Sequence, residues 1–182
     1  MEKEIKNNAS ETAKLAIRQI EELLRQQMER AESLAESEPP KDFNSLEKIT
    51  VGLCGGDGIG PIIMKEAKRL LEVLLKEQLS SEKIVLKEIE GLTIENRLAL
   101  GKAVPEDVLS AIKECDVILK GPTTTPKGGT LESANVTLRR ELDLYANVRP
   151  VTVPEEGIDW MFYRENTEGE YALGSKGIEI PG

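Results

Sequence analysis

The sequence predicts an α/β fold with parallel strands and helices, preceded by a long N-terminal helix. From residue 48 onward, short apolar runs alternate with helical patterns, which is typical of a parallel sheet covered by helices. Before that point, apolar residues recur three and four positions apart, which is the pattern of one helix face. The 182 residues correspond to about 1.2 domains and can bury a sizeable core.

The first 40 residues are expected to form a helical extension. Asn8 with Glu11 predicts the start of the helix, and Pro39-Pro40 predicts its end because proline disfavours helix in the residue before it. The apolar stripe needs a surface to cover it, either the chain's own domain or a second copy of the chain. The stripe consists of Ala13, Ala16, Ile17, Ile20, Leu23, Leu24, Met28, Ala31, Leu34 and Ala35.

Three apolar runs predict buried strands at residues 49–54, 84–89 and 116–119. A helix is expected to begin near Pro61, and another at Pro105. The expected apolar face of the first of these helices is Ile63, Ala67, Leu70, Leu71, Leu74 and Leu75, and that of the second is Val108, Leu109 and Ile112.

The last 50 residues have a different pattern. Residues 135–145 predict a charged helix, residues 146–153 an extended segment, and residues 158–163 a further strand. Tyr171-Ala172-Leu173 is a candidate for another strand.

Composition excludes several classes of function. Lys plus Arg number 24 against 33 Asp plus Glu, and this net charge of −9 disfavours nucleic acid as a partner. The absence of histidine rules out histidine-based catalysis and His-ligated zinc. Cys54 and Cys115 are expected to be buried thiols, and no apolar run is long enough to span a membrane. We therefore expect a cytoplasmic protein that binds no membrane.

A glycine-rich turn, residues 55–61, follows the first strand. Its spacing from Gly56 is Gly-Asp-Gly-Ile-Gly-Pro, which differs from the Gly-x-Gly-x-x-Gly of dinucleotide-binding folds. The turn is either a tight strand-to-helix connection or a cradle for phosphate.

Arginines gather in the last third of the chain, at Arg139, Arg140, Arg149 and Arg164, and Ser133 and Asn135 lie just before the first of them. Guanidinium groups bind carboxylates bidentately, so converging arginines would suit a polycarboxylate ligand. The alternative is a set of surface salt bridges with Glu132, Glu141 and Asp143.

Five motifs in order resemble the decarboxylating hydroxy-acid dehydrogenases, the isocitrate and isopropylmalate dehydrogenase family. The resemblance covers residue 48 to the end. Within it, the sequence of Asp143–Pro150 is more similar to the NAD-linked type of isocitrate dehydrogenase. The motifs are Gly56–Pro61; Lys120-Gly121-Pro122 with Thr124-Thr125-Pro126; Ser133-Ala134-Asn135 with Leu138-Arg139-Arg140; Asp143–Pro150; and Arg164–Glu168 with Tyr171.

The resemblance implies a role for individual residues. Arg139, Arg149 and Arg164 would hold the α- and β-carboxylates of the substrate. Ser133 and Asn135 would reach the third carboxylate of isocitrate, although homoisocitrate stays open as a substrate. Tyr171 would reprotonate the enol that remains after carbon dioxide leaves, and the cofactor-binding residues would be Lys120, Thr124 and Thr125.

The implied reaction transfers hydride to NAD (or NADP) and then releases carbon dioxide with the help of Mg²⁺ or Mn²⁺. Family members are about twice as long, and their metal-binding aspartates lie in the half that this sequence lacks. Metal ligands are therefore expected from a missing half or from a partner chain. The resemblance also makes residues 48–144 a portion of the large domain and residues 145–182 the start of the small one.

Three hypotheses follow from this partial match. The chain is one half of a split or truncated dehydrogenase, a non-catalytic regulatory subunit that binds polycarboxylates and assembles through its N-terminal helix, or a truncated gene product without present activity. The first two predict a homo- or hetero-oligomer, and we expect little or no turnover from the chain alone.

Overall fold

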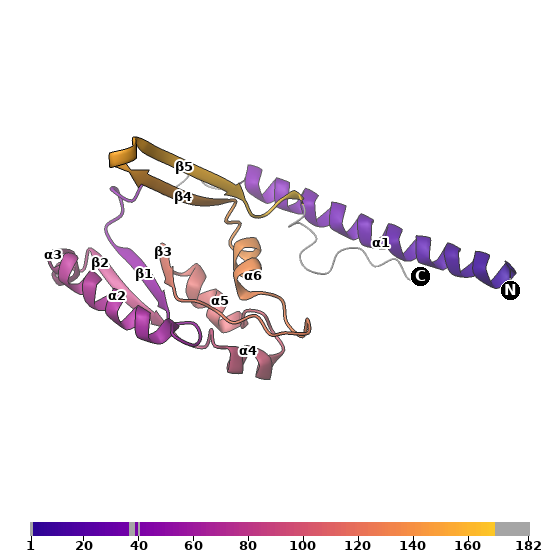
Figure 1. The fold of residues 1–182 in the computed structure, drawn as a ribbon, viewed down its shortest axis with the longest axis horizontal. Coiled ribbons are helices and arrows are strands. Elements are labelled where there is room, and N and C mark those ends of the chain that lie inside the picture. Colours follow the sequence, from indigo (N-terminus) through magenta and orange to yellow (C-terminus); the bar gives the residue numbers. More distant parts are fainter. Residues whose placement is uncertain (1, 37–38, 40, 170–182) are drawn as a thin grey trace. The chain divides into compact units, whose positions relative to one another are not determined.

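A computed structural model describes residues 2–36, 39 and 41–169, and the chain divides into two compact units (Figure 1). One unit comprises residues 1–41 and 167–182, and the other comprises residues 42–166. The division into a large-domain portion at 48–144 and a small-domain start at 145–182 stays a prediction.

The first unit contains helix α1, Glu2–Ala35, whose 34 residues span about 51 Å at roughly 1.5 Å per residue. The expected long N-terminal helix is therefore confirmed. Its expected start at Asn8 is wrong, because the helix already runs from Glu2 and Asn8 lies inside it. Asparagine marks a helix start only where the chain before it is not helical. No helix among the described residues combines the length and apolar character that crossing a bilayer requires.

The second unit is built on a parallel three-stranded sheet in the order β2-β1-β3. The strands are β1 (Ile49–Cys54), β2 (Ile84–Ile89) and β3 (Val117–Lys120), which confirms the predicted α/β class with parallel strands. Because β1 lies in the centre, its carboxyl end meets the loops that follow both neighbouring strands. The helices of the second unit are α2 (Gly60–Leu74), α3 (Lys76–Ser80), α4 (Ile94–Leu100), α5 (Glu106–Lys113) and α6 (Ala134–Glu141).

Two helices were missed in the sequence, α3 and α4. The signals for α4 are nevertheless present: the Thr93 hydroxyl accepts a hydrogen bond from the Asn96 amide, and Gly101 ends the helix in the left-handed conformation. Helix α6 is shorter than expected and ends at Glu141, since Asp143 adopts a positive φ of 47° that a helix does not accommodate.

The hydrophobic core lies on one face of the sheet, between the strands and helices α5 and α6. Cys54 and Ile89 are register partners on neighbouring strands and both face this core. Val108 and Ile112 of α5 pack against them, as their helical spacing predicted. Leu138 of α6 completes this side.

The other face of the sheet is only partly covered, by α2. Alternation along β1 directs Leu53 to this face, where it is buried together with Met64 of α2. The predicted apolar face of α2 is only partly covered, because Ile63, Leu70 and Leu74 are 49%, 58% and 66% exposed. The apolar spacing did reveal a helix, but three strands are too few to cover the whole apolar face of α2.

A hairpin follows α6. Strands β4 (Ala146–Val153) and β5 (Ile158–Glu165) pair antiparallel over eight residues each, joined by a short 3-10 turn, Pro154–Glu156. The extended segment and the strand expected at 146–153 and 158–163 are thus confirmed. The strand expected at Tyr171–Leu173 lies outside the described residues.

Candidate functional site

The glycine-rich turn after β1 packs directly against the segment that follows β3. Gly56 has φ +74°, and a Cβ atom there would lie 2.1 Å from the Pro122 carbonyl oxygen. The Asp57 amide donates to that same oxygen at 2.7 Å, and the Gly60 amide donates to Asp57 O at 2.8 Å. Two amides of the turn are therefore engaged within the protein, as in a tight strand-to-helix connection.

A buried ion pair lies beneath this turn. The Asp57 and Arg97 side chains are 3% and 0% exposed, with Oδ2 and Nη1 3.8 Å apart. The guanidinium also donates to three main-chain carbonyls, those of Ala103 (2.7 Å), Thr124 (2.8 Å) and Glu132 (3.4 Å). Burial lowers the pKa of Arg97 and the Asp57 carboxylate opposes that shift. Arg97 thus joins three loops that are distant in sequence.

The ion pair fixes the main chain at Thr124. Its amide donates to Asp57 Oδ2 at 2.7 Å, and its carbonyl accepts from Arg97. Asp57 Oδ1 accepts from the Ile94 amide at 2.6 Å. The side chains of Thr124 and Thr125 remain exposed. The predicted cofactor-binding threonines therefore belong to a loop whose main chain is fixed by hydrogen bonds to Asp57 and Arg97.

Neither member of this pair was predicted from the sequence to be a functional residue. Asp57 was interpreted only as part of a glycine turn, and Arg97 was not singled out. No local signal identifies Arg97, because its partners lie between 6 and 40 residues away in the sequence.

Three of the predicted site residues line one small cavity. Lys120 from the end of β3 and Asn135 and Arg139 from α6 border a space of about 210 Å³. The Asn135 Oδ1 accepts from the Thr123 hydroxyl at 3.4 Å. The remaining walls are apolar: Ile112, Ile118, Leu138, Leu142 and Leu144.

The electrostatics of this cavity favour an anion. Burial lowers the pKa of the Lys120 ammonium; Arg97 and Arg139 reinforce that shift, while Cys54 and Asp57 oppose it. Within the described ranges, Lys120 Nζ hydrogen-bonds only to neutral oxygens, donating to Gly121 O at 2.7 Å and to the Thr123 hydroxyl at 3.5 Å. Two cations next to one partly apolar cavity bind a carboxylate more strongly than they would in open water.

Arg139 and Arg140 are adjacent but differ in their contacts. Arg140 pairs with Glu132 through two nitrogens, at 3.1 and 3.0 Å, so the salt-bridge alternative holds for this residue. In the described part of the chain, the Arg139 side chain makes no hydrogen bond or ion pair. Arg139 is therefore available to a ligand.

Ser133 occupies the N-cap position of α6. Its side chain makes no capping hydrogen bond to the helix. The residue is half-buried, one position before Ala134, where the helix begins. An uncommitted hydroxyl at a helix N-terminus is well placed to donate to an anion.

The other two predicted arginines lie on the β4–β5 hairpin, apart from the cavity-lining residues. Asn147 is the register partner of Arg164, and Arg149 lies two residues further along β4, so all three share one face of the hairpin. Arg149 Nε donates to Asn147 Oδ1 at 3.0 Å. The structure therefore gathers the predicted residues into two groups, one at the cavity and one on the hairpin. Tyr171 lies outside the described residues.

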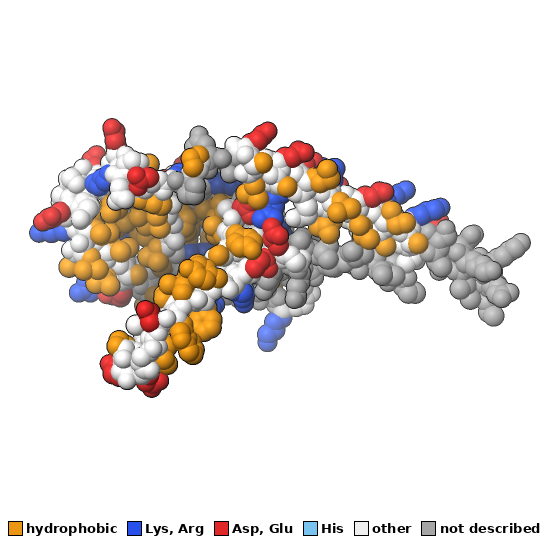
Figure 2. Space-filling model, turned by 90° about the horizontal axis from the view of Figure 1, so that it is seen from above, with side chains coloured by type: hydrophobic (Ala, Val, Ile, Leu, Met, Phe, Trp, Pro, Cys, Tyr) orange, Lys and Arg blue, Asp and Glu red, His pale blue; other side chains and the backbone are white. Residues whose placement is uncertain are grey.

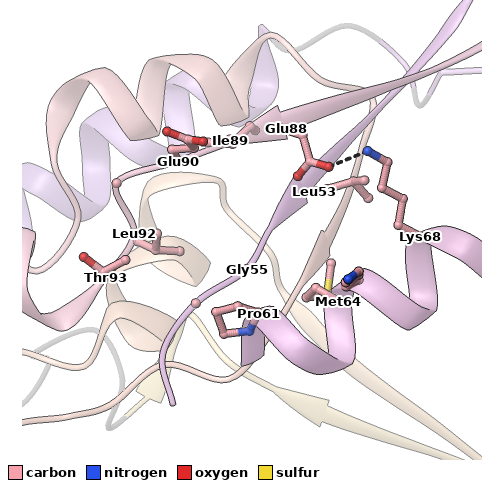
Figure 3. A pocket seen from close by; sticks show the side chains of 13 residues that line it. Leu53, Gly55, Pro61, Met64, Lys68, Glu88, Ile89, Glu90, Leu92 and Thr93 are labelled. Carbon is pink, nitrogen blue, oxygen red and sulfur yellow. Dashed lines mark hydrogen bonds and ion pairs between the residues drawn. The ribbon is translucent and has the colours of Figure 1, made fainter. Parts of the chain in front are cut away.

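A larger cavity, about 540 Å³, contains none of the predicted site residues (Figure 3). It opens at the carboxyl ends of β1 and β2 beside α2, between the glycine turn and the segment Glu90–Thr93. The Lys68 ammonium and the Glu88 carboxylate pair across it at 2.8 Å. Two lysines, Lys65 and Lys68, and two glutamates, Glu88 and Glu90, line this cavity. Its charges balance, so it favours an anion less than the smaller cavity does.

The described residues do not fit a divalent metal. No three aspartate, glutamate or cysteine side chains among them gather closely enough to hold an ion. A nicotinamide cofactor is a different case, because the exposed hydroxyls of Thr124 and Thr125 could contact one beside Lys120.

Residues 48–181 match the isocitrate/isopropylmalate dehydrogenase family. An NADP-dependent isocitrate dehydrogenase of Caldococcus noboribetus is 43% identical over 144 residues, covering 74% of this chain and 32% of that enzyme. The corresponding enzyme of Archaeoglobus fulgidus is 43% identical over 136 residues, covering 69% and 31%. The chain thus spans about a third of the length of these curated relatives, and their names differ from the NAD-linked type expected from the sequence.

Solved structures give the same result. A β-decarboxylating dehydrogenase of Thermococcus kodakarensis superposes with a TM-score of 0.55 at 33% identity, covering 66% of this chain and 35% of that one. An isocitrate dehydrogenase of Methylococcus capsulatus gives 0.53 at 33% identity, covering 68% and 36%.

Proposed function

The chain belongs to the isocitrate/isopropylmalate dehydrogenase family, and on that premise we propose that it supplies the polycarboxylate-binding part of a decarboxylating dehydrogenase. The observation that carries the proposal is the pair of cations, Lys120 and Arg139, beside Asn135 at one small cavity. A ligand with several carboxylates gains from each cation, while a neutral ligand would leave both charges uncompensated.

The substrate we propose is isocitrate. Asn135 at the cavity and Ser133 at the N-cap of α6 would add an amide and a hydroxyl, and a third carboxylate needs such additional donors. Arg149 and Arg164 are proposed to hold the remaining carboxylates from the hairpin. Binding would fix the hydroxyl-bearing carbon, and Tyr171 would donate a proton after decarboxylation.

The cofactor we propose is NADP, following the names of the curated relatives. When bound, a nicotinamide accepts the hydride that leaves the hydroxyl-bearing carbon. The contribution of this chain is the loop of Thr124 and Thr125, which the Asp57–Arg97 pair holds in place. We propose that any metal ligands come from another part of the protein or from a partner chain, since the described residues do not fit the ion.

Calorimetric titration of the purified chain with isocitrate tests this function. We expect binding that weakens about 10- to 100-fold in Arg139→Met, the range for loss of one charge-assisted contact. Arg140→Met is the matched control, because its guanidinium is already paired with Glu132, and it should change the affinity less than about threefold. If millimolar isocitrate produces neither heat nor a thermal shift, the proposal is wrong.

A second measurement separates catalysis from binding. Formation of reduced cofactor is followed with isocitrate, Mg²⁺ or Mn²⁺, and NADP or NAD, with and without a candidate partner chain. Turnover that needs the partner supports a split dehydrogenase. Binding without turnover in any mixture supports the alternative, a regulatory subunit that binds polycarboxylates.

A further inference from the structure

Helix α1 carries a row of exposed apolar side chains, and it lies outside the residues that match the dehydrogenase family. Leu24 and Met28 are 56% and 64% exposed, and Ile17 is 53% exposed. Figure 2 shows apolar side chains along this helix with charged ones beside them. The row consists of Ala13, Ile17, Ile20, Leu24, Met28, Ala31 and Ala35, all exposed.

The neighbouring face of α1 is already used within its own unit. Arg30 on that face pairs with the Glu168 carboxylate at 3.0 Å and donates to the Thr167 hydroxyl at 3.2 Å. The half-buried positions follow the same helical spacing: Thr12, Ala16, Gln19, Leu23, Gln27 and Arg30. The exposed row is thus a second face, which the described residues of this unit leave uncovered.

The spacing of the row is symmetric about Leu24. The intervals are 4, 3, 4, 4, 3 and 4 residues, so the row reads the same in both directions. The mean interval of about 3.7 residues is close to the 3.6 of a straight helix, so the row runs nearly along the axis. Such a row matches itself when two copies pair antiparallel about a two-fold axis at Leu24.

Side-chain size also favours the antiparallel arrangement. It places Ile17 of one copy against Ala31 of the other, and Ile20 against Met28, with Leu24 against Leu24 at the axis and the small Ala13 and Ala35 together at the ends. A parallel pair would set Ile17 against itself and Ala31 against itself, crowding one level and leaving space at another.

The charged residues beside the row, on the side away from the half-buried face, also favour the antiparallel arrangement. At about 100° per residue, Lys14, Glu21, Arg25 and Glu32 fall on one side of the row. The antiparallel pair brings Lys14 level with position 34 of the other copy, between its Glu32 and Glu36. It also brings Glu21 level with position 27, next to Arg25, which pairs with Glu22 and Glu29 of its own helix. Opposite charges therefore meet across the seam.

We propose that α1 is a self-assembly element that pairs antiparallel with α1 of a second copy, with the two-fold axis at Leu24. The occupant of the exposed row is thus the same row of another chain. The pair would join two copies of the chain through a helix that lies outside the residues matching the dehydrogenase family.

Light scattering on the full chain tests the assembly. We expect a particle of twice the 20.1 kDa chain mass at tens of micromolar. Leu24→Glu places two carboxylates together at the axis and should return the particle to one chain mass, with helix content unchanged by circular dichroism. The matched control is Gln26→Lys on the opposite side of α1, which should stay dimeric. A wild-type monomer, or a dimer that Leu24→Glu leaves intact, would overturn the proposal.

Cross-linking tests the orientation. A mixture of Ile17→Cys and Ala31→Cys chains should form a disulfide dimer under mild oxidation, while neither variant alone should do so. The wild-type chain gives the background from Cys54 and Cys115. Dimers from Ile17→Cys alone would show a parallel pair and refute the antiparallel one.

Charge reversal tests the antiparallel pairing without introducing cysteine. Lys14→Glu with Arg18→Glu should weaken the dimer about tenfold or more, because the new carboxylates face Glu32 and Glu36 of the other copy. Adding Glu32→Lys and Glu36→Lys to the same chain should restore it. Absence of that rescue, with helix content preserved, would contradict the charge pairing.

Discussion

Arg97→Met perturbs the buried ion pair beneath the glycine turn. The substitution keeps a long, flexible apolar side chain in a fully buried position and removes the guanidinium. Asp57 then keeps its hydrogen bonds to the Ile94 and Thr124 amides but loses its buried countercharge. The three carbonyls that accepted from Arg97 lose a donor at the same time.

The magnitude follows from that geometry. Removing one member of a buried ion pair costs about 3–5 kcal/mol, because the other charge stays buried. That is a large share of the roughly 5–15 kcal/mol that separates folded from unfolded protein. At about 2–4 °C per kcal/mol for a chain of this size, the melting temperature should fall by roughly 6–20 °C. Arg97→Lys keeps the charge but not the planar guanidinium, so it should lower the stability less than Arg97→Met does.

Urea unfolding followed by far-ultraviolet circular dichroism measures the free energy of unfolding. Arg140→Met is the matched control: its side chain is 46% exposed, and its pair with Glu132 should contribute less than about 1 kcal/mol. Hydrogen exchange adds a local readout. The Thr124 amide, which donates to Asp57, should exchange faster in Arg97→Met even under conditions where the protein stays folded.

Two results would refute this reasoning. One is a free energy of unfolding for Arg97→Met equal to that of Arg140→Met. The other is a loss of stability without faster exchange at Thr124, which would show that Arg97 stabilises the core without holding the loop.

Further predictions concern the glycine turn and the buried thiol. Gly56→Ala should destabilise the protein by several kcal/mol or prevent folding, since its Cβ would meet the Pro122 oxygen. Gly58→Ala is the control: Gly58 also has a positive φ but lies in open space, so this substitution should cost only about 1 kcal/mol. Equal losses of stability in urea unfolding would contradict the close approach at Gly56. Burial raises the pKa of Cys54 from 9.0 to about 11, so the folded state resists ionisation of this thiol. Stability from this group is fully present below pH 9 and is lost as pH rises towards 11, by about 2–3 kcal/mol in total. Unfolding measured between pH 8 and 11 should show a shallower decline in Cys54→Ala, and an unchanged slope would argue against the shift.

Much of the fold could be predicted because strand and helix signals are local. The run 49–54 is mostly apolar, and the structure makes it the central strand, with its last three residues buried. Helix α2 shows the limit of such signals. Its apolar spacing marked a helix correctly but said nothing of how much of that face the rest of the chain would cover.

The candidate site divides in the same way. Asn135 and Arg139 were predicted to bind the substrate and Lys120 to bind the cofactor, and the structure places all three at one cavity. The difference between Arg139 and Arg140 was beyond the sequence, because it depends on which guanidinium reaches Glu132. Whether the hairpin arginines act on the same ligand stays a prediction, as does the role of Tyr171.

The order of amino acids alone showed where the strands and most of the helices lie, which family the motifs resemble, and that α1 has an apolar stripe. Each of these depends on neighbours within a few positions along the chain. That Arg97 reaches Asp57, 40 residues away, and that together they hold the Thr124 loop became visible only in the folded chain. Such contacts arise because the strand order β2-β1-β3 brings distant loops to one end of the sheet, and no local pattern encodes that meeting.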